Sequence, residues 1–422
     1  MSAKIMRPVT AALVTAALVL SGAGSAAAQP STPDASVVTA WNAIAVRTIF
    51  TENATPIPSS NLYFGFVSLA VHDAVVAIEG RYQPYIRQPR PRGRASSEAA
   101  AATAAYLVLR HYFPTSAATL AVDHTATLAA IPDGTAEARG VEVGTVAAAN
   151  LISARENDGR NAAITFDQTP APGVWRPTPD AFAPMAVPWL GFVEPLSLRS
   201  PTQIRLPGPD PLRSRAYARD FAEVKAYGAL NGSARSPEQT ETALFWNANS
   251  VIQYQVTLRD QVVRRGLDIV AAARAFGLLS TAMGDAAIAC WRSKYDYGYW
   301  RPITAIRLAD TDGNPATAPD PAWASLAQTP PYPDYTSGHA CLTGALTGTL
   351  GYLFGRRGLD LVLSSTVTGT TRHYDSLAAL ERDTQNARIW LGLHFRRAMT
   401  DGLRIGHGAA AWVTAHELRP RH

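Results

Sequence analysis

Basic residues and histidines gather in three short segments of the C-terminal half, and their types suit the binding of one oxyanion. Lys294 and Arg301 lie seven residues apart, a spacing that predicts two helical turns and one shared helix face. On such a face an ammonium and a planar guanidinium can hold different oxygens of the same anion. Ser337, Gly338 and His339 stand directly before a helical pattern, and free N–H groups at a helix N-terminus bind oxyanions. These two segments together predict an anion site.

The third segment adds Arg388 and His394, a further cation and a second histidine. Histidine transfers protons near neutral pH, so His339 and His394 are candidates for acid–base or ligand roles. Taken singly, each residue is most simply explained as a helix-surface charge or a structural histidine. The presence of all three segments in one chain favours a functional site over that explanation.

The order and spacing of the three segments resemble a known family signature. It comprises a lysine separated by six intervening residues from an Arg-Pro pair, a Ser-Gly-His triplet, and an arginine separated by five intervening residues from a histidine. This pattern resembles that shared by vanadium-dependent haloperoxidases and the type-2 phosphatidic acid phosphatase superfamily of acid phosphatases. The likeness extends over most of the chain and points to a bacterial secreted haloperoxidase-like member with an all-α helical bundle.

The resemblance implies a role for each residue. In the haloperoxidases the residue matching His394 binds vanadium, so it would be the metal ligand here, and the residue matching His339 is the acid–base group. Lys294 would polarise hydrogen peroxide while halide is oxidised and passed to a small organic acceptor. The residues implied to bind the vanadate cofactor are Lys294, Arg301, Ser337, Gly338, Arg388 and His394.

Two other functions remain open on the same residues. In an acid phosphatase, phosphate would occupy the site in place of vanadate and a phosphomonoester would be the substrate. His394 would then be the nucleophile that forms a phosphohistidine, and His339 would protonate the leaving alcohol. A protein with an idle anion site is the third alternative. Phosphate is also expected to compete with vanadate under the haloperoxidase interpretation.

Aromatic residues near the segments favour the haloperoxidase side. Trp291 precedes Lys294 by three residues, and Tyr332 precedes His339 by seven, where haloperoxidases place a residue of the halide pocket. Thr336 replaces the usual proline before the Ser-Gly pair, a change expected to be harmless.

Two departures concern the charged support of the site. Ala398 stands four residues after His394, where the family carries an aspartate that orients the histidine, so another group must hold the ring. Asp401 is a turn further on and is not assumed to substitute. The Phe-Trp pair ending at Trp246 is followed by asparagine rather than an acid, so support of Arg388 is expected to be neutral.

Helices must position these segments, because apolar residues recur at helical spacing and no sustained strand alternation is found. A stretch with 11 of the chain's 30 prolines, from Pro170 to Pro211, is expected to be an ordered connection. Helices are predicted at 240–262, 266–293, 339–355, 374–391 and 396–417, after a capping box at Ser236. The predicted organisation is a signal peptide at 1–28, a helical region at 29–157, a proline-rich connection at 158–235 and a C-terminal bundle at 236–422.

The N-terminus and the composition bear on location and partners. Lys4 and Arg7 precede an apolar stretch that ends in small residues near Ala28, a pattern typical of a cleaved secretory signal. We therefore expect a secreted or periplasmic protein, and no later segment is expected to span a membrane or hold the protein stably on one. A net charge of +5 over 422 residues, without a basic run, argues against nucleic acid as a partner.

Several other polar residues are weighed against structural roles. His72 and Asp73 are adjacent on an apolar helix and are expected to be structural, and His373 is a weaker candidate for the site. The acidic segment 310–314 is interpreted as a turn, because it lacks the spacing of a calcium loop. Cys290 and Cys341 flank the site in sequence, so a disulfide between them and two buried thiols both remain open.

Overall fold

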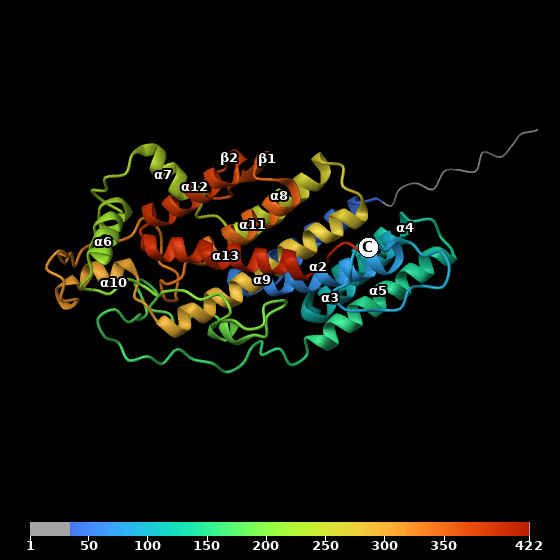
Figure 1. Cartoon of the computed structure of the whole chain (residues 1–422), viewed down its shortest axis with the longest axis horizontal. Helices are drawn as coiled ribbons and strands as arrows, with labels where there is room; N and C mark the ends of the chain where they lie inside the picture. The colour runs from blue at the N-terminus through green and yellow to red at the C-terminus, as the bar shows by residue number, and fades with distance from the viewer. Residues whose placement is uncertain (1–33, 422) are drawn as a thin grey trace, which may run out of the picture. The chain divides into compact units, whose positions relative to one another are not determined.

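The computed structural model describes residues 34–421, and the predicted signal peptide at 1–28 lies outside these residues. The described chain is mostly helical, with thirteen α-helices and one two-stranded antiparallel sheet, so the all-α fold class is confirmed (Figure 1). The helices are α1 (Ser36–Val46), α2 (Ile57–Glu79), α3 (Ser97–Tyr112), α4 (Ala117–Ala129), α5 (Thr135–Ala154), α6 (Arg215–Gly228), α7 (Pro237–Phe245), α8 (Ser250–Arg264), α9 (Ile269–Tyr297), α10 (Pro302–Arg307), α11 (Gly338–Phe354), α12 (Leu377–Trp390) and α13 (Arg396–His416). The strands are β1 (Arg357–Ser364) and β2 (Thr371–Ser376).

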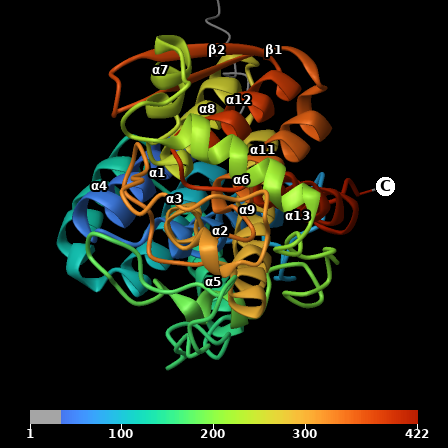
Figure 2. The same ribbon diagram turned by 90° about the vertical axis from the view of Figure 1, so that its left-hand side faces the viewer.

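The long helix α9 links the N-terminal helices to the C-terminal ones. It contacts α2, α11 and α13, and both views place it among these helices (Figures 1 and 2). Nearly every residue of α9 from Ile269 to Lys294 is buried, which explains its small and apolar composition. Because its C-terminal turn carries Lys294, burial of α9 also fixes the position of that lysine.

The proline-rich connection is anchored between α2 and α9 by one leucine. Leu196 inserts where both helices carry a glycine, since a Cβ on Gly65 or Gly284 would lie 2.6 or 2.8 Å from its Cδ1 atom. Trp175 of the same connection is also buried, whereas Phe182 is 62% exposed. The connection is ordered, as expected, because Trp175 and Leu196 are buried. The exposed side chain of Phe182 does not help to anchor it.

Asp285 on α9 holds the backbone around Leu196. Its two carboxylate oxygens accept hydrogen bonds from the backbone N–H groups of Leu196, Ser197 and Leu198, at 2.6, 2.9 and 2.7 Å. The Asp285 side chain is fully buried, and Leu196 and Leu198 are buried with it, so their N–H groups depend on the carboxylate for a hydrogen-bond partner. One carboxylate therefore satisfies three backbone groups in a segment that has no regular hydrogen-bonding pattern.

Replacing Asp285 by asparagine is expected to lower the free energy of unfolding by about 2–4 kcal/mol. The amide keeps one oxygen but turns its NH₂ group toward a backbone N–H, leaving donors unpaired. Urea unfolding followed by circular dichroism measures the change. Asp260→Asn, which removes a more exposed ion pair to Arg264, is the control and is expected to cost less than about 1 kcal/mol. Equal losses in the two variants would contradict the anchoring role.

Glycines bring α11 and α13 into close contact. A Cβ on Gly344 would lie 2.6 Å from the backbone oxygen of Leu403, and a Cβ on Gly402 would lie 2.7 Å from the Cβ atom of Ala340. Gly348 similarly faces Ala410, at 2.6 Å. The expectation that Gly344 and Gly348 serve helix packing is confirmed, and the packing places the start of α11 beside the start of α13.

Several local differences from the predicted elements have clear causes. The segment predicted as one helix over 240–262 is broken into α7 and α8, because Asn249 caps α8 through its side chain. The capping box at Ser236 is confirmed, since Gln239 and Ser236 exchange backbone-to-side-chain hydrogen bonds. Helix α6 was not predicted and begins where Ser214 accepts a hydrogen bond from the N–H of Tyr217.

The hairpin of β1 and β2 contradicts the prediction that no strand alternation is sustained. Leu359, Leu361 and Leu363 alternate with more exposed residues along β1 and pack into the core. The alternation is short and irregular because positive φ at Gly358 and Asp360 accompanies a register shift. The hairpin contacts α8 and α12 (Figure 2).

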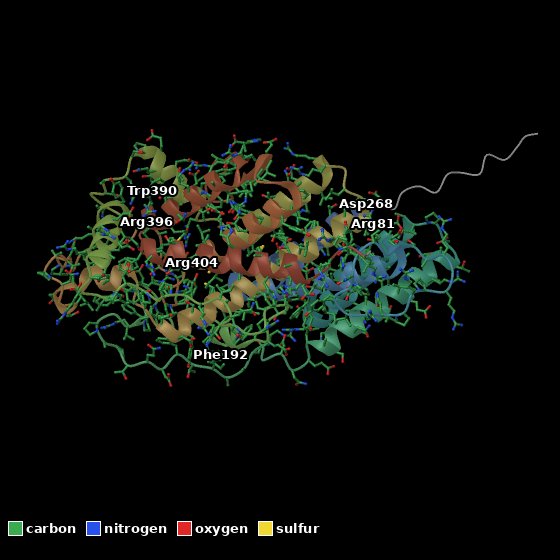
Figure 3. The ribbon with its side chains drawn as sticks, viewed as in Figure 1. Arg81, Phe192, Asp268, Trp390, Arg396 and Arg404 are labelled. Atoms are coloured by element: carbon green, nitrogen blue, oxygen red, sulfur yellow. The ribbon has the colours of Figure 1, made fainter. Side chains whose placement is uncertain are left out.

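Helix α2 is long and apolar enough to cross a membrane by length and composition alone. Its side chains are buried inside the protein, mainly against α3 and α9. Arg81 follows α2 and forms two hydrogen bonds of 2.7 Å with Asp268, which caps α9 (Figure 3). The ends of α2 and α9 are thereby joined, as expected of core helices.

Candidate functional site

The structure brings the three predicted segments together around the start of α11. Lys294 lies in the last turn of α9, Arg301 precedes α10, and Arg388 lies in the last turn of α12. His394 lies in the loop between Trp390 and Arg396, both labelled in Figure 3. These four side chains are at most 2% exposed. We call Lys294, Arg301 and Arg388 the three buried cations.

The prediction that Lys294 and Arg301 share one helix face is wrong. Helix α9 ends at Tyr297, and Gly298 takes a left-handed conformation with φ of 51° that closes the helix. Arg301 then precedes Pro302 at the start of α10. The two residues meet because the chain turns at Gly298, and the Arg-Pro pair is itself a typical helix start.

Backbone carbonyl groups hold the first two cations in place. The Lys294 ammonium donates to the backbone oxygens of Pro333 and Asp334, at 2.7 and 3.2 Å. Arg301 donates through Nε to the backbone oxygen of Tyr332 and through Nη1 to that of Leu393, at 2.7 and 2.8 Å. Neutral carbonyls orient these groups without cancelling their charge. Burial consequently lowers the pKa of Lys294 to about 8.

Arg388 is the least satisfied of the three buried cations. Its Nη1 atom donates to the backbone oxygen of Trp246 at 3.2 Å, and its Nε atom has no partner among the described residues. The expectation of neutral support from the Phe245–Trp246 turn is confirmed. Burial lowers the pKa of this guanidinium to about 10, so it stays charged at neutral pH.

His394 is held by Asp334, a residue that the sequence did not single out. The Asp334 Oδ1 atom lies 2.7 Å from His394 Nδ1, and both side chains are almost fully buried. On the other side of the ring, Arg301 Nη1 lies 3.3 Å from His394 Nε2. Because guanidinium can only donate, Nε2 must be the acceptor and the ring proton sits on Nδ1. The Nε2 lone pair therefore faces the three buried cations.

Asp334 thus replaces the orienting aspartate that the family carries at position 398. Asp401 does not substitute, as expected, because its oxygens accept from Tyr335 Oη and Arg397 Nε at 2.7 and 2.6 Å. The only sequence signal for Asp334 was its place three residues before Ser337. Its sequence distance from His394 is 60 residues, so no local pattern links the two.

The start of α11 supplies the remaining predicted residues. Ser337 caps the helix, and a Cβ on Gly338 would lie 3.3 Å from the Trp291 ring. His339 has an Nε2 atom without a partner among the described residues. Burial, followed by the charge of Arg388, lowers the pKa of His339 well below its ordinary value. A neutral imidazole with one open nitrogen therefore stands beside the three buried cations.

Comparisons with known proteins show what this chain is similar to. Residues 274–421 match the model of the VCPO second helical-bundle domain. A vanadium chloroperoxidase from Curvularia inaequalis is 28% identical over 231 residues, or 40% of this chain and 37% of that protein. Both matches support the resemblance to the vanadium haloperoxidase superfamily. The aligned part spans well under two thirds of the Curvularia protein.

Solved structures of bacterial vanadium haloperoxidases share the fold. A bacterial vanadium-dependent iodoperoxidase matches with a TM-score of 0.78 and 22% identity, covering 93% of this chain and 98% of that one. An apo-type bacterial vanadium-dependent chloroperoxidase matches with a TM-score of 0.69 and 19% identity, covering 85% and 92%. The helical fold is therefore that of the vanadium haloperoxidases over nearly the whole described chain.

In this haloperoxidase-like protein, two aromatic rings line the cations. The Tyr332 ring centroid lies 4.8 Å from Lys294 Nζ and 4.9 Å from Arg301 Cζ. Tyr332 also packs against Trp291, with centroids 5.0 Å apart. Aromatic faces stabilise nearby cations without adding a formal negative charge. The role of Tyr332 in a halide pocket stays a prediction.

Other polar residues have structural explanations in this haloperoxidase-like protein. His72 Nε2 lies 3.0 Å from the backbone oxygen of Gln83, and Asp73 accepts from two backbone N–H groups. The expectation of structural roles for His72 and Asp73 is confirmed. His373 is exposed on the hairpin and pairs with Asp360 at 2.9 Å, so it does not approach the cations. The segment 310–314 forms a turn, as predicted.

Of the two alternatives left open for Cys290 and Cys341, the structure has two free, buried thiols and no disulfide between them. A cavity of about 690 Å³ lies elsewhere, between α6 and residues 316–324, and includes none of the three buried cations. The site is therefore identified by its chemistry rather than by the size of a cavity.

Proposed function

We propose that this protein is a vanadium-dependent haloperoxidase that binds vanadate at His394 and uses hydrogen peroxide to oxidise halide. The observation that carries the proposal is the Nε2 lone pair of a buried histidine, oriented by Asp334 and directed at three buried cations. The similarity to vanadium haloperoxidases supports an enzyme of this kind.

The charge balance of the site fits an anionic cofactor. Lys294, Arg301 and Arg388 together carry three positive charges. The Asp334 carboxylate lies beside them, since it is hydrogen-bonded to His394 and the Asp334 backbone oxygen accepts from Lys294. Buried cations without counter-ions are costly, so an oxyanion would offset part of that cost. Lys294 has three N–H donors and uses two of them in hydrogen bonds to carbonyl groups. Arg388 Nε makes no hydrogen bond to the described residues. Donors therefore remain for the oxygens of a bound anion.

The residues present suit vanadate in particular. His394 would bind the metal through Nε2, and the oxygens would be held by Lys294, Arg301, Ser337, Gly338 and Arg388. Bound vanadate would supply a Lewis-acidic centre that activates hydrogen peroxide toward halide. His339 is neutral at pH 7 and can take a proton at Nε2 from incoming peroxide. The fixed cations stabilise negative charge without reorganising.

A secreted acid phosphatase is the second candidate, because the same dyad suits a nucleophile. With its proton on Nδ1, His394 presents Nε2 to a phosphoryl group, and the three buried cations would hold its oxygens. The Curvularia chloroperoxidase and the bacterial iodoperoxidase that resemble this chain are haloperoxidases, which supports the first function. Inorganic phosphate is expected to compete with vanadate in either case.

A paired assay of the purified protein tests these functions. Bromination of a phenolic dye that requires both vanadate and peroxide would support the haloperoxidase. Phosphomonoester hydrolysis inhibited by vanadate would support the phosphatase instead. Neither activity, together with no measurable binding of vanadate or phosphate, would leave a protein with an idle site and overturn both proposals.

The ionisation of Lys294 leads to a prediction about pH. Because the pKa of Lys294 lies near 8, the ammonium is present below that pH and lost above it. Vanadate affinity is therefore expected to fall up to about tenfold per pH unit above pH 8. Lys294→Arg keeps a charge that does not titrate in this range. Dividing the vanadate affinity of the unchanged protein by that of Lys294→Arg cancels the effect of the ionisation of vanadate itself. A ratio that does not change from pH 7 to 9.5 would contradict the loss of the Lys294 charge near pH 8.

Export is also part of the proposal. The signal peptide predicted at residues 1–28 lies outside the described residues, so the support for it is the sequence pattern alone. N-terminal sequencing of protein from the extracytoplasmic fraction is expected to begin near Gln29. Recovery of the full chain from the cytoplasm would argue against export.

A further inference from the structure

Two buried thiols lie directly behind the predicted anion site. Thr336 Oγ1 lies 3.4 Å from Cys290 Sγ and 3.5 Å from Cys341 Sγ, so one hydroxyl joins both cysteines. Cys290 Sγ also donates to the backbone oxygen of Thr336 at 3.4 Å. Both side chains are 0% exposed. These cysteines are therefore neighbours from two different helices rather than isolated core residues.

The two thiols stand one helical turn from residues predicted to hold the cofactor. Cys290 precedes Lys294 by four residues on α9. Cys341 lies one turn into α11, where its N–H donates to the backbone oxygen of Ser337 at 3.0 Å. A covalent link between the sulfur atoms would therefore tie together the two helix ends that carry Lys294 and Ser337.

We infer that Cys290 and Cys341 form a redox-sensitive pair that hydrogen peroxide converts into a disulfide. The sulfur of Cys290 attacks one peroxide oxygen and the O–O bond breaks. Cys290 becomes a sulfenic acid and one water molecule is released. The sulfur of Cys341 then attacks that sulfur and releases a second water. Two thiols lose two electrons and two protons in total, and one peroxide is reduced to two water molecules.

The surroundings make Cys290 the first thiol to react. It lies one turn before the Lys294 ammonium and is hydrogen-bonded by Thr336. Burial raises the pKa of Cys290, but the Cys341 thiol and Lys294 outweigh that effect and lower it overall. The exposure of the site to peroxide rests on the proposed function, because peroxide is the co-substrate there. The thiol reaction itself needs neither vanadate nor halide.

The test is peroxide treatment of the reduced full-length protein without vanadate or halide. Excess peroxide is removed, the protein is unfolded, and free thiols are alkylated before mass spectrometry. The expected product carries no alkyl groups, is lighter by two hydrogens, and yields one cross-linked peptide containing both cysteines. Cys341→Ala is the matched variant, in which peroxide is expected to leave Cys290 as a sulfenic or sulfinic acid.

Thermal unfolding gives an independent measurement of the same link. Closing a loop of about 50 residues is expected to raise the unfolding midpoint by about 5 °C, and dithiothreitol should reverse the rise. Two alkylated cysteines after peroxide treatment, or sulfinic acids without a cross-link, would overturn the inference. Absence of halide oxidation in the separate bromination assay would overturn the proposed function and leave this result unaffected.

Discussion

Replacing His394 by alanine is expected to abolish vanadate binding and to reduce any vanadate-dependent halide oxidation by at least roughly 1,000-fold. Among the described residues, the substitution removes the imidazole whose Nε2 lone pair is directed at the three buried cations by a carboxylate. Those cations alone can still attract an oxyanion, but the imidazole that Asp334 orients toward it would be gone, and His339 is assigned the proton-transfer role. Isothermal titration with vanadate and a bromination assay measure the two effects.

The matched control is His373→Ala, which removes an exposed histidine paired with Asp360 on the hairpin. It is expected to leave both vanadate affinity and turnover unchanged. Retained turnover in His394→Ala would show that the metal-binding residue is misassigned. Loss of binding in both variants would instead point to a general loss of structure, which circular dichroism detects.

Replacing Asp334 by asparagine is expected to weaken vanadate binding by about 10-fold to 100-fold. Asparagine can donate its NH₂ group to His394 Nδ1, which moves the ring proton to Nε2 and blocks that lone pair. Loss of the carboxylate also removes a repulsion toward the anion. Asp334 lies on the far side of the imidazole, however, so the change of tautomer is the larger effect. Calorimetry gives the affinity, and nitrogen NMR of labelled histidine reports the tautomer.

Asp401→Asn provides a contrasting result on a second buried aspartate close in space. Asp401 accepts from Tyr335, Arg397 and Arg404 rather than from the histidine. Its loss is expected to lower the unfolding midpoint while vanadate affinity changes less than about threefold. A larger loss of vanadate affinity in Asp401→Asn than in Asp334→Asn would show that Asp401, and not Asp334, orients His394.

The spacing of charged residues predicted the family and the all-α class, but it misjudged local geometry. Lys294 and Arg301 were expected on one helix face, whereas Gly298 ends α9 between them. The glycine and the Arg-Pro pair were both visible in the sequence as a helix end and a helix start. These local signals outweighed the seven-residue spacing, because glycine adopts the left-handed conformation at little free-energy cost and so ends the helix between the two residues.

The support of the site was the part that sequence reasoning missed. Loss of the aspartate at position 398 indicated that another group must hold His394, and Asp334 is that group. No helical or strand periodicity relates residues 60 positions apart in loops of different elements. Similarly, the socket for Leu196 depends on two glycines, Gly65 and Gly284, that are far apart in the chain.

The sequence by itself determined the chemistry available to this protein: three cations, two histidines and a helix start in an order typical of one superfamily. Residue types and spacing carry that information because the bound oxyanion requires particular donors. Only the tertiary structure decided which nitrogen of His394 is free, what orients it, and that Cys290 and Cys341 meet behind Ser337. Those facts depend on distances between separate helices, which are set by the packing of α9, α11 and α13.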